Sequence, residues 1–422
     1  MEKEKTLIVA LDLGGNRRFE AHVRELTELA KACDLSVCEC IIQHADRANA
    51  ATYIGSGKAE EVLYAIRQYD ADLVIFDGEL SPMQLKNLKN ILDIPVMDRN
   101  TLILEIFSRR ARTKESKLQV EIASLKYALP RLVGLHDALS RQGGASGAMS
   151  NKGAGEKKLE LDRRHIENRI AFLRKELENV AKTRVTQRSL RKKSGLPLVG
   201  LVGYTNAGKS SIMNGMLSLY GRSEEKMVFE KDMLFATLET GVREISTEKG
   251  KTFLLSDTVG FVDDLPHDLV QAFHSTLEEV CESSLLIHVI DITEEYLQEH
   301  MDVTTRTVKS LGAGDIPMLT VFNKTDLAGT TGYPKRTGDV LYISAKQPES
   351  IAFLAAAICE KLFAGRKKCE LFIPYDKGSI LSAITTSCEV LSTEYEAEGI
   401  RAVAYLDEKH AGRYLAYIQN IE

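Results

Sequence analysis

Four short segments constrain this chain more than any other feature, and they are Gly203–Ser210, Asp257–Gly260, Asn323–Asp326 and Ser344–Lys346. The first fits the pattern G-x-x-x-x-G-K-[ST], in which a glycine-rich loop cradles phosphates at the start of a helix. Each segment follows a run of residues typical of a β-strand. A single match would be a moderate signal, but the four together predict an α/β domain that holds one guanine nucleotide.

The phosphate loop has to hold about four negative charges, and small residues let its backbone N–H groups point inward. We expect Lys209 to bridge the β- and γ-phosphates and Ser210 to bind Mg²⁺. Asp257 is expected to hold the same ion, and the N–H of Gly260 to contact the γ-phosphate. The residues of the loop predicted to bind the nucleotide are Gly203, Tyr204, Thr205, Asn206, Ala207, Gly208, Lys209, Ser210 and Ser211.

The third and fourth segments predict guanine rather than adenine. Asp326 can accept hydrogen bonds from both the ring N–H and the exocyclic amine of guanine, and a buried acceptor left unmet by adenine costs ~1–3 kcal/mol. Asn323 is expected to tie this loop to the phosphate loop, and Lys324 to lay its stem over the base. The Ser344–Lys346 segment is expected to donate a backbone N–H, that of Ala345, to the guanine oxygen.

A switch threonine that completes the Mg²⁺ site is expected between the phosphate loop and Asp257, in a segment that orders on the γ-phosphate. Thr237 is our choice and Thr240 is the alternative, because position alone does not separate them. Together with Lys209 and Gly260, Thr237 makes up the predicted catalytic set.

Position 261 is phenylalanine, whereas many switch GTPases carry a water-orienting glutamine there. The Phe261 ring cannot hydrogen-bond a water, so we predict slow hydrolysis alone and acceleration by a partner. Asp263, His267 and His274 are nearby polar candidates for the missing role. Asn206 resembles the asparagine of potassium-dependent GTPases, which makes K⁺ a further candidate cofactor beside Mg²⁺ and GTP or GDP.

Composition narrows the class of protein. Hydrophobic residues make up 44% and charged residues 27% of the 422 positions, as in ordinary globular proteins. No run of about 18 apolar residues occurs, so we expect no membrane-spanning segment. The seven cysteines are scattered, odd in number and without metal-ligand spacing, which predicts reduced thiols and a cytoplasmic protein. We expect a monomer.

Alternation of strands and helices predicts a multidomain α/β protein. The expected parts are an N-terminal α/β domain at 1–100, a basic helical hairpin with a glycine-rich tip at 101–192, a Ras-like P-loop GTPase domain at 196–366 and a small C-terminal α/β domain at 367–422. In the first part, Tyr53–Lys58 is either a turn into a helix or a second phosphate site that lacks a Ser/Thr ligand for Mg²⁺. In the last part, a helix is expected near Ser379–Leu391.

The hairpin is predicted from two sets of apolar residues spaced 4, 3, 4, 3, the pattern of two helices packed side by side. The two sets are Leu118, Ile122, Leu125, Leu129 and Leu132, and then Ile166, Ile170, Leu173, Leu177 and Val180. Each glycine costs roughly 1 kcal/mol inside a helix. The glycine-rich segment Gly143–Gly155 is therefore expected to lie outside both helices.

Positive charge is concentrated in the hairpin. The chain has a net charge of −5, yet residues 101–195 hold 22 Lys/Arg against 10 Asp/Glu. A basic segment in an acidic protein predicts a polyanionic partner, and a solvated helix face is the alternative. The candidate RNA contacts are Arg109, Arg110, Arg112, Lys152, Lys157, Lys158, Arg163 and Arg164.

At these motifs the chain resembles the HflX family of bacterial GTPases. The segments that carry the resemblance are Tyr53–Lys58, Lys117–Glu121, Leu129–Leu132, Gly155–Arg164, Gly203–Ser210, Leu234–Leu238 and Asp257–Phe261. The resemblance implies a Mg²⁺-dependent GTPase that binds the large ribosomal subunit and its RNA, rather than DNA. It also implies that the ribosome stimulates hydrolysis, and that the protein splits or rescues stalled ribosomes under stress.

Two functions from different classes fit this resemblance. A GTPase that remodels ribosomes must bind them with different affinity in its two nucleotide states. A binding module would instead cap, silence or drug-protect the large subunit without splitting ribosomes, and hydrolysis would only reset it. A signalling switch with a protein partner is a third interpretation, which the basic hairpin disfavours.

Overall fold

The computed structural model describes residues 3–14, 18–142, 152–193, 196–221, 235, 241–247, 251–258, 260–261, 279–329, 332–406 and 408–421. The chain folds into two compact units. One unit comprises residues 1–180, 231–239 and 259–276, and the other comprises 181–230, 240–258 and 277–422. No helix in the described part of the chain is both long and apolar enough to cross a membrane.

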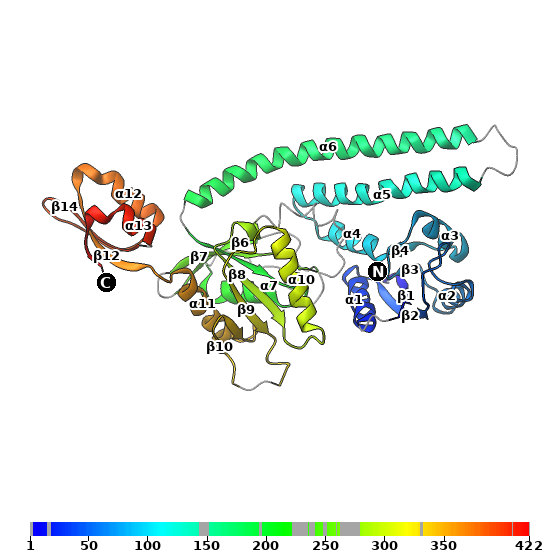
Figure 1. Ribbon diagram of the computed structural model, residues 1–422, viewed down its shortest axis with the longest axis horizontal. Helices are drawn as coiled ribbons and strands as arrows, with labels where there is room; N and C mark the ends of the chain where they lie inside the picture. The colour runs from blue at the N-terminus through cyan, green and yellow to red at the C-terminus, as the bar shows by residue number, and fades with distance from the viewer. Residues whose placement is uncertain are drawn as a thin grey trace. The chain divides into compact units, whose positions relative to one another are not determined.

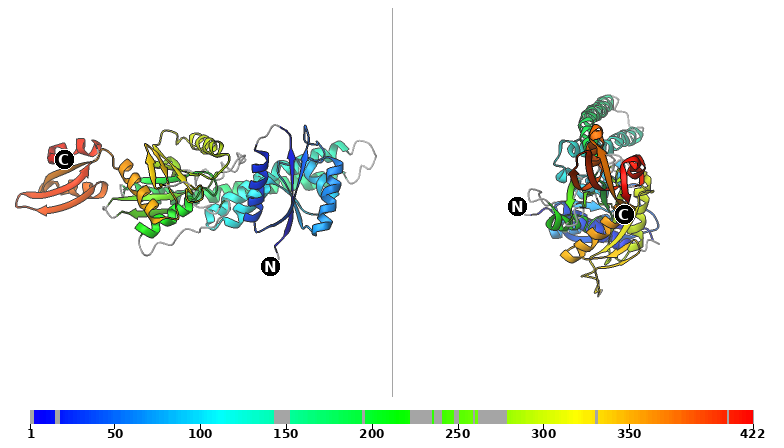
Figure 2. Two further views of the ribbon diagram at one scale, coloured as in Figure 1. Left: turned by 90° about the horizontal axis from the view of Figure 1, so that it is seen from below. Right: turned by 90° about the vertical axis from the view of Figure 1, so that its left-hand side faces the viewer.

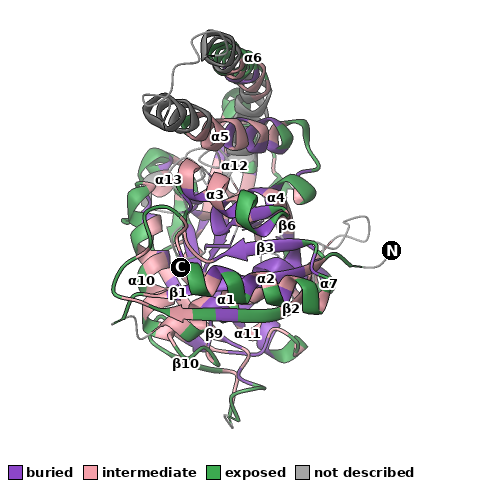
Figure 3. Ribbon diagram, turned by 90° about the vertical axis from the view of Figure 1, so that its right-hand side faces the viewer, coloured by how far each residue is buried: buried purple, intermediate pink, exposed green. Residues whose placement is uncertain are grey.

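The first unit begins with a four-stranded parallel sheet in the order β2-β1-β3-β4. Helices α1 and α4 pack on one face of this sheet, and α2 and α3 pack on the other (Figures 1 and 2). Strand β3 is buried throughout and is drawn purple in Figure 3. The elements are β1 (Lys5–Asp12), α1 (Phe19–Ala32), β2 (Ser36–His44), α2 (Ser56–Tyr69), β3 (Leu73–Phe76), α3 (Pro82–Leu92), β4 (Val96–Asp98) and α4 (Arg99–Arg110).

The segment before α2 forms a turn rather than an open phosphate cradle. Helix α2 starts at Ser56, and the N–H of Gly55 donates to Oε1 of Gln43 at 3.0 Å. The ammonium of Lys58 lies 2.6 Å from Glu61 on the same helix. Because these groups already have partners, the structure favours the turn over a second phosphate site.

Helix α4 packs in the core of the N-terminal domain, so this core includes residues beyond 100. Leu102, Ile106 and Phe107 are buried in the same cluster as α1 and β1. At the end of α4, Arg109 donates to the carbonyl of Cys33 at 2.6 Å, which fastens the last turn to α1.

A buried carboxylate holds the first helix of the predicted hairpin, which we call the arm, to this sheet. Asp98 is 2% exposed and accepts hydrogen bonds from Tyr127 at 2.6 Å and Arg131 at 3.0 Å, both from α5 (Lys114–Gln142). The Arg131 guanidinium also lies over the Tyr127 ring and donates to the carbonyl of Leu80. A buried ion pair with several hydrogen bonds fixes geometry, so this network sets how α5 leaves the sheet.

Helices α5 and α6 (Lys152–Lys193) lie side by side and form the predicted arm (Figure 1). Leu118, Ile122, Ile170 and Leu173 are buried between them, and the other predicted residues that pack against this cluster are Leu125, Ile166, Leu177 and Val180. One prediction about the tip was wrong, because α6 already includes Gly153 and Gly155. Residues in the first turn of a helix lack intrahelical N–H bonds, so glycine disturbs fewer bonds there.

The second unit contains a seven-stranded sheet in the order β10-β11-β9-β8-β5-β7-β6. The inner strands run parallel, and β6 and β10 pair antiparallel at the two edges. The elements are β5 (Leu198–Val202), α7 (Lys209–Tyr220), β6 (Gly241–Ser246), β7 (Thr252–Asp257), β8 (Leu285–Asp291), α10 (Leu297–Ser310), β9 (Met318–Asn323), β10 (Lys335–Thr337), β11 (Val340–Tyr342) and α11 (Pro348–Leu362).

The last part of the chain is an antiparallel sheet with the order β13-β14-β12-β15. Its β-α-β-β-α-β sequence of elements is the split βαβ arrangement. The helix expected to reach Leu391 ends at Ser387, because the following residues pair with β14 as a strand. The elements are β12 (Lys367–Pro374), η2 (Tyr375–Lys377), α12 (Gly378–Ser387), β13 (Glu389–Tyr395), β14 (Gly399–Leu406), α13 (Glu408–Arg413), η3 (Leu415–Tyr417) and β15 (Ile418–Ile421).

Candidate functional site

The phosphate loop joins the end of β5 to the start of α7, and two glycines make its path possible. Gly203 has φ 153°, and a Cβ there would lie 2.2 Å from the carbonyl oxygen of Val289. Gly208 has φ 95°, and a Cβ there would lie 2.1 Å from Nδ2 of Asn323. Any side chain at either position would force the loop away from β8 or from Asn323, so the pattern's glycines are required by geometry.

Lys209 is folded back into this loop. Its side chain is buried, and Nζ donates to the carbonyl oxygens of Gly203 at 3.0 Å and Tyr204 at 2.7 Å. Burial lowers the pKa of Lys209 to about 8, and the nearby charge of Asp257 partly opposes that shift. Among the described residues, the Lys209 ammonium bonds to these two neutral carbonyls, so an anion brought to the loop would improve its charge balance.

Ser210 and Asp257 meet on the other side of the loop. Ser210 Oγ donates to Oδ2 of Asp257 at 2.8 Å, and Asp257 is fully buried at the end of β7. A hydroxyl and a carboxylate are the hard oxygen donors that Mg²⁺ prefers. The two residues therefore fit a magnesium site.

Asn323 joins three of the four sequence segments. Its side chain is 2% exposed, Nδ2 donates to the carbonyl of Ala207 at 3.0 Å, and Oδ1 accepts the N–H of Ala345 at 2.9 Å. The Ala345 N–H, expected to meet guanine, thus has Asn323 as its partner in this structure. One amide side chain holds the phosphate loop and both base-binding loops in a fixed arrangement.

Lys324 has a partner that the motifs do not contain. Its ammonium lies 2.7 Å from Oδ2 of Asp291, whose side chain is 8% exposed. Oδ1 of Asp291 accepts hydrogen bonds from the N–H and hydroxyl of Thr293 at 2.9 and 2.7 Å. Asp291 ends β8 directly beside Asn323 in the sheet register, and a polar residue at the end of an apolar strand is the signal that could have identified it.

The remaining base-binding residues lie together at the edge of the site. The Asp326 side chain is 24% exposed, and Nζ of Lys346 lies 3.9 Å from its Oδ2. Ser344 is buried, and its N–H donates to the hydroxyl of Ser350 at 3.3 Å at the start of α11. The carboxylate of Asp326 is therefore accessible to a base, while Ser344 is anchored in the protein.

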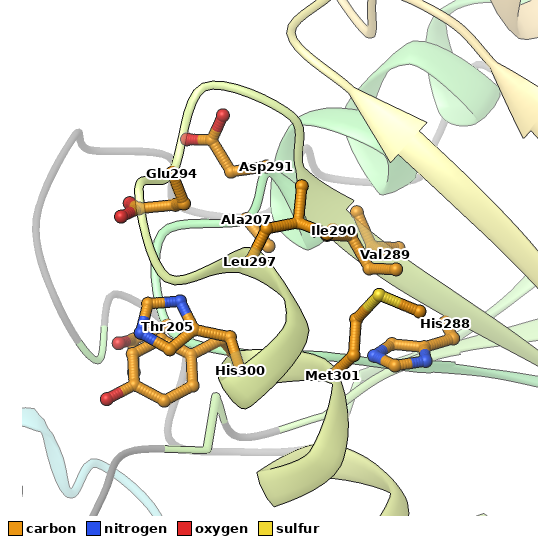
Figure 4. A pocket seen from close by; sticks show the side chains of 11 residues that line it. Thr205, Ala207, His288, Val289, Ile290, Asp291, Glu294, Leu297, His300 and Met301 are labelled. Atoms are coloured by element: carbon orange, nitrogen blue, oxygen red, sulfur yellow. The ribbon is translucent and has the colours of Figure 1, made fainter.

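A cavity lies between the phosphate loop, β8 and α10, and Figure 4 shows the side chains that line it. The ring of Tyr204 stacks on His300 with centroids 3.8 Å apart and planes 4° apart. His288 is buried in the wall, where burial and then the charge of Lys209 lower its pKa to about 4. His288 is therefore neutral at physiological pH and adds no charge behind the phosphates.

The predicted switch segments are only partly described. Thr237, Thr240, Asp263, His267 and His274 lie outside the described residues. Those that are described include Gly260, which is buried, and Phe261, which is 3% exposed.

Phe235, two positions before Thr237 in the sequence, is also described. Its ring is 2% exposed and packs in the core of the first unit, with its centroid 4.6 Å from that of Phe107 at an angle of 74°. Sequence reasoning did not identify this role, since an isolated aromatic residue in a predicted loop carries no periodic signal.

The candidate RNA contacts fall into different environments. Arg109 and Arg110 donate to carbonyls of the N-terminal domain, so they have structural partners. Arg163 is exposed and paired with Glu167 at 3.0 Å, and Arg164 is exposed. Arg112 is exposed as well, while Lys152, Lys157 and Lys158 lie in α6 with side chains outside the described set.

Comparison with known proteins agrees with this organisation. Residues 20–108 match the family described as GTP-binding GTPase N-terminal, 110–191 match GTP-binding GTPase Middle Region, and 198–324 match 50S ribosome-binding GTPase. The protein named GTPase HflX from Caldanaerobacter subterraneus subsp. tengcongensis is 41% identical over 96% of this chain and 91% of its own length. The protein of the same name from Lacrimispora saccharolytica is 39% identical over 96% and 94%.

Among solved structures, the crystal structure described as a complex of SsGBP and GDP resembles this chain. It matches with a TM-score of 0.50 and 24% identity, over 85% of this chain and 98% of that one. At this level of identity the likeness concerns the fold alone.

Proposed function

The chain belongs to the HflX family of GTPases, and from that premise we propose that it binds the large ribosomal subunit and uses GTP to split or rescue stalled ribosomes under stress. The observation that carries the proposal is that one chain combines a guanine-nucleotide site, linked through Asn323, with a long basic two-helix arm. The match of 198–324 to the family described as 50S ribosome-binding GTPase supports the same partner.

Guanine selection rests on Asp326, and the position of the base rests on its neighbours. The carboxylate of Asp326, whose side chain is 24% exposed, accepts from the ring N–H and amine of guanine, and a bound adenine leaves this covered acceptor unmet. Asp291 holds the ammonium of Lys324, which leaves the aliphatic stem of that lysine to cover the base. Asp326 would then select guanine over adenine, and Lys324 would fix the orientation of the base.

The phosphate end of the site works through charge. Nζ of Lys209 exchanges two carbonyl partners for the β- and γ-phosphate oxygens, which are charged acceptors and therefore stronger ones. Ser210 and Asp257 would hold Mg²⁺, with Thr237 proposed as the switch ligand. Mg²⁺ bound there would supply positive charge to the phosphates during cleavage. Gly260 offers its N–H to the γ-phosphate.

Hydrolysis is proposed to be slow without a partner. The Phe261 side chain is buried and apolar, so it cannot align a water molecule for attack. Binding to the ribosome would supply or order the missing group. Asn206, held at φ 60° in the phosphate loop, is the proposed K⁺ ligand, and equal hydrolysis rates in K⁺ and Na⁺ buffers would contradict that role.

The second candidate function is capping of the large subunit without splitting, for silencing or drug protection. The basic arm favours ribosome binding in both cases, so the two functions differ only in what happens to intact ribosomes. The test mixes intact ribosomes with the protein and a non-hydrolysable GTP analogue and measures subunits by sedimentation. Splitting predicts free subunits, whereas an unchanged ribosome peak that carries the protein would favour capping.

A further inference from the structure

One side of helix α6, opposite the side that packs on α5, is exposed to solvent. Six of its residues each lie three or four positions from another of the six, so they share one face of the helix, and all six are exposed. We name this face the outer stripe, and it comprises Leu161, Arg164, His165, Asn168, Phe172 and Lys175. The inner face, with Ile170 and Leu173 buried, accounts for the packing of the arm, so the outer stripe is not needed to hold the two helices together.

Two large apolar side chains on this stripe face solvent. Leu161 is 54% exposed and Phe172 is 55% exposed, and they lie three helical turns apart on the same side. A single exposed apolar residue on a surface needs no explanation, and what sets Phe172 apart is that basic side chains lie on both sides of its ring. The guanidinium of Arg169 lies 5.6 Å from the centroid of the Phe172 ring and borders it on one side.

Two of the acidic residues beside the stripe are already paired with basic side chains. The carboxylates of Glu167 and Glu176 are engaged by Arg163 at 3.0 Å and by Lys114 at 2.8 Å. Within the described residues, Arg164 and Lys175 make no hydrogen bond or ion pair. Arg164 and Lys175 therefore offer two unpaired positive charges in the described part of the chain, on either side of an exposed aromatic ring.

From this arrangement we infer that the outer stripe binds RNA, with Phe172 stacked on an unpaired base and with Arg164 and Lys175 on neighbouring phosphates. The inference deepens the proposed function by naming the face of the arm that meets ribosomal RNA. Exposed aromatic rings flanked by basic side chains are how proteins hold unpaired nucleotides. A membrane surface fits less well, because two apolar residues along three turns give too little apolar area for insertion.

The test measures affinity for purified large ribosomal subunits, and for protein-free ribosomal RNA, by filter binding over a range of salt concentrations. Phe172→Ala is expected to weaken binding to both roughly 5- to 100-fold, the loss typical of one stacked base. Phe172→Tyr keeps the ring and should retain binding. The matched control is Tyr395→Ala, which removes a 72% exposed ring from the C-terminal sheet and should change nothing.

The charged residues give an independent readout. Combined Arg164→Gln and Lys175→Gln should reduce the slope of log affinity against log salt by about 1–2, because two phosphate contacts are lost. Phe172→Ala should leave that slope unchanged. Since all three side chains are exposed, thermal melts by circular dichroism should match wild type.

Three results would overturn the inference. If large subunits bind Phe172→Ala and the double glutamine variant as tightly as wild type, the outer stripe does not bind RNA, and the proposed function is unaffected. Loss of subunit binding in Phe172→Ala without any effect on protein-free RNA would identify a protein contact instead of RNA. Failure of the wild-type protein to bind large subunits in every nucleotide state contradicts the proposed function and the stripe together.

Discussion

Replacing Asn323 with alanine is predicted to weaken binding of GDP and GTP roughly 30-fold or more. The change removes the donor to the Ala207 carbonyl and the acceptor of the Ala345 N–H. Ala207 is 1% exposed, so its carbonyl would carry the full cost of a buried unmet group, while the half-buried Ala345 N–H is partly reached by water. Together the two losses amount to about 2–4 kcal/mol.

Without nucleotide, the loops of this variant can relax and admit water. Nucleotide binding forces them back into the arrangement seen here, so the cost falls on the dissociation constant. Titration of a fluorescent guanine nucleotide measures it directly. Asn100→Ala, which removes another buried asparagine in the first unit, is the control and should bind normally. A dissociation constant for Asn323→Ala within threefold of wild type would show that Asn323 does not hold the loops in their binding arrangement.

Three further predictions follow from the structure. Burial lowers the pKa of Lys209 to about 8, and phosphate binding requires the charged form of this side chain. The affinity for GDP, measured by calorimetry, should therefore fall roughly fourfold between pH 7 and 8.5. Lys209→Arg, which stays charged over this range, should show no such fall. Phe235→Ala should lower the free energy of unfolding of the first unit by about 3–5 kcal/mol in urea, and a value near that of the exposed Phe172→Ala would contradict its burial. Arg131→Met should lower the free energy of unfolding by about 3–5 kcal/mol, because it leaves the Asp98 carboxylate buried without its cation. An unchanged thermal melt would show that this ion pair does not hold α5 to the sheet.

The elements with strong periodic patterns are those that sequence predicts well. The sequence pattern predicts a helix at Phe19–Ala32 and strands at Leu198–Val202 and Leu285–Asp291, and α1, β5 and β8 have these bounds. The apolar residues that join α5 and α6 were likewise readable from spacing alone, because a narrow seam leaves few alternatives. Patterns of this kind succeed because one local period dictates one buried face.

Features set by contacts far apart in the sequence could not be predicted in the same way. The segment around Leu391 has a helix-compatible pattern, but pairing with β14 makes it a strand. The burial of Phe235 beside Phe107 depends on two residues from distant parts of the chain. The pairing of Asp291 with Lys324 depends on sheet order, which no local motif encodes.

We propose that a guanine nucleotide controls how tightly this protein holds the ribosome. The test measures the affinity of the full chain for purified large ribosomal subunits, first with GDP bound to the protein and then with a non-hydrolysable GTP analogue bound to it. We predict clearly tighter binding with the analogue, since a nucleotide can shift the system only through such a difference. Equal affinities in the two states would contradict the account.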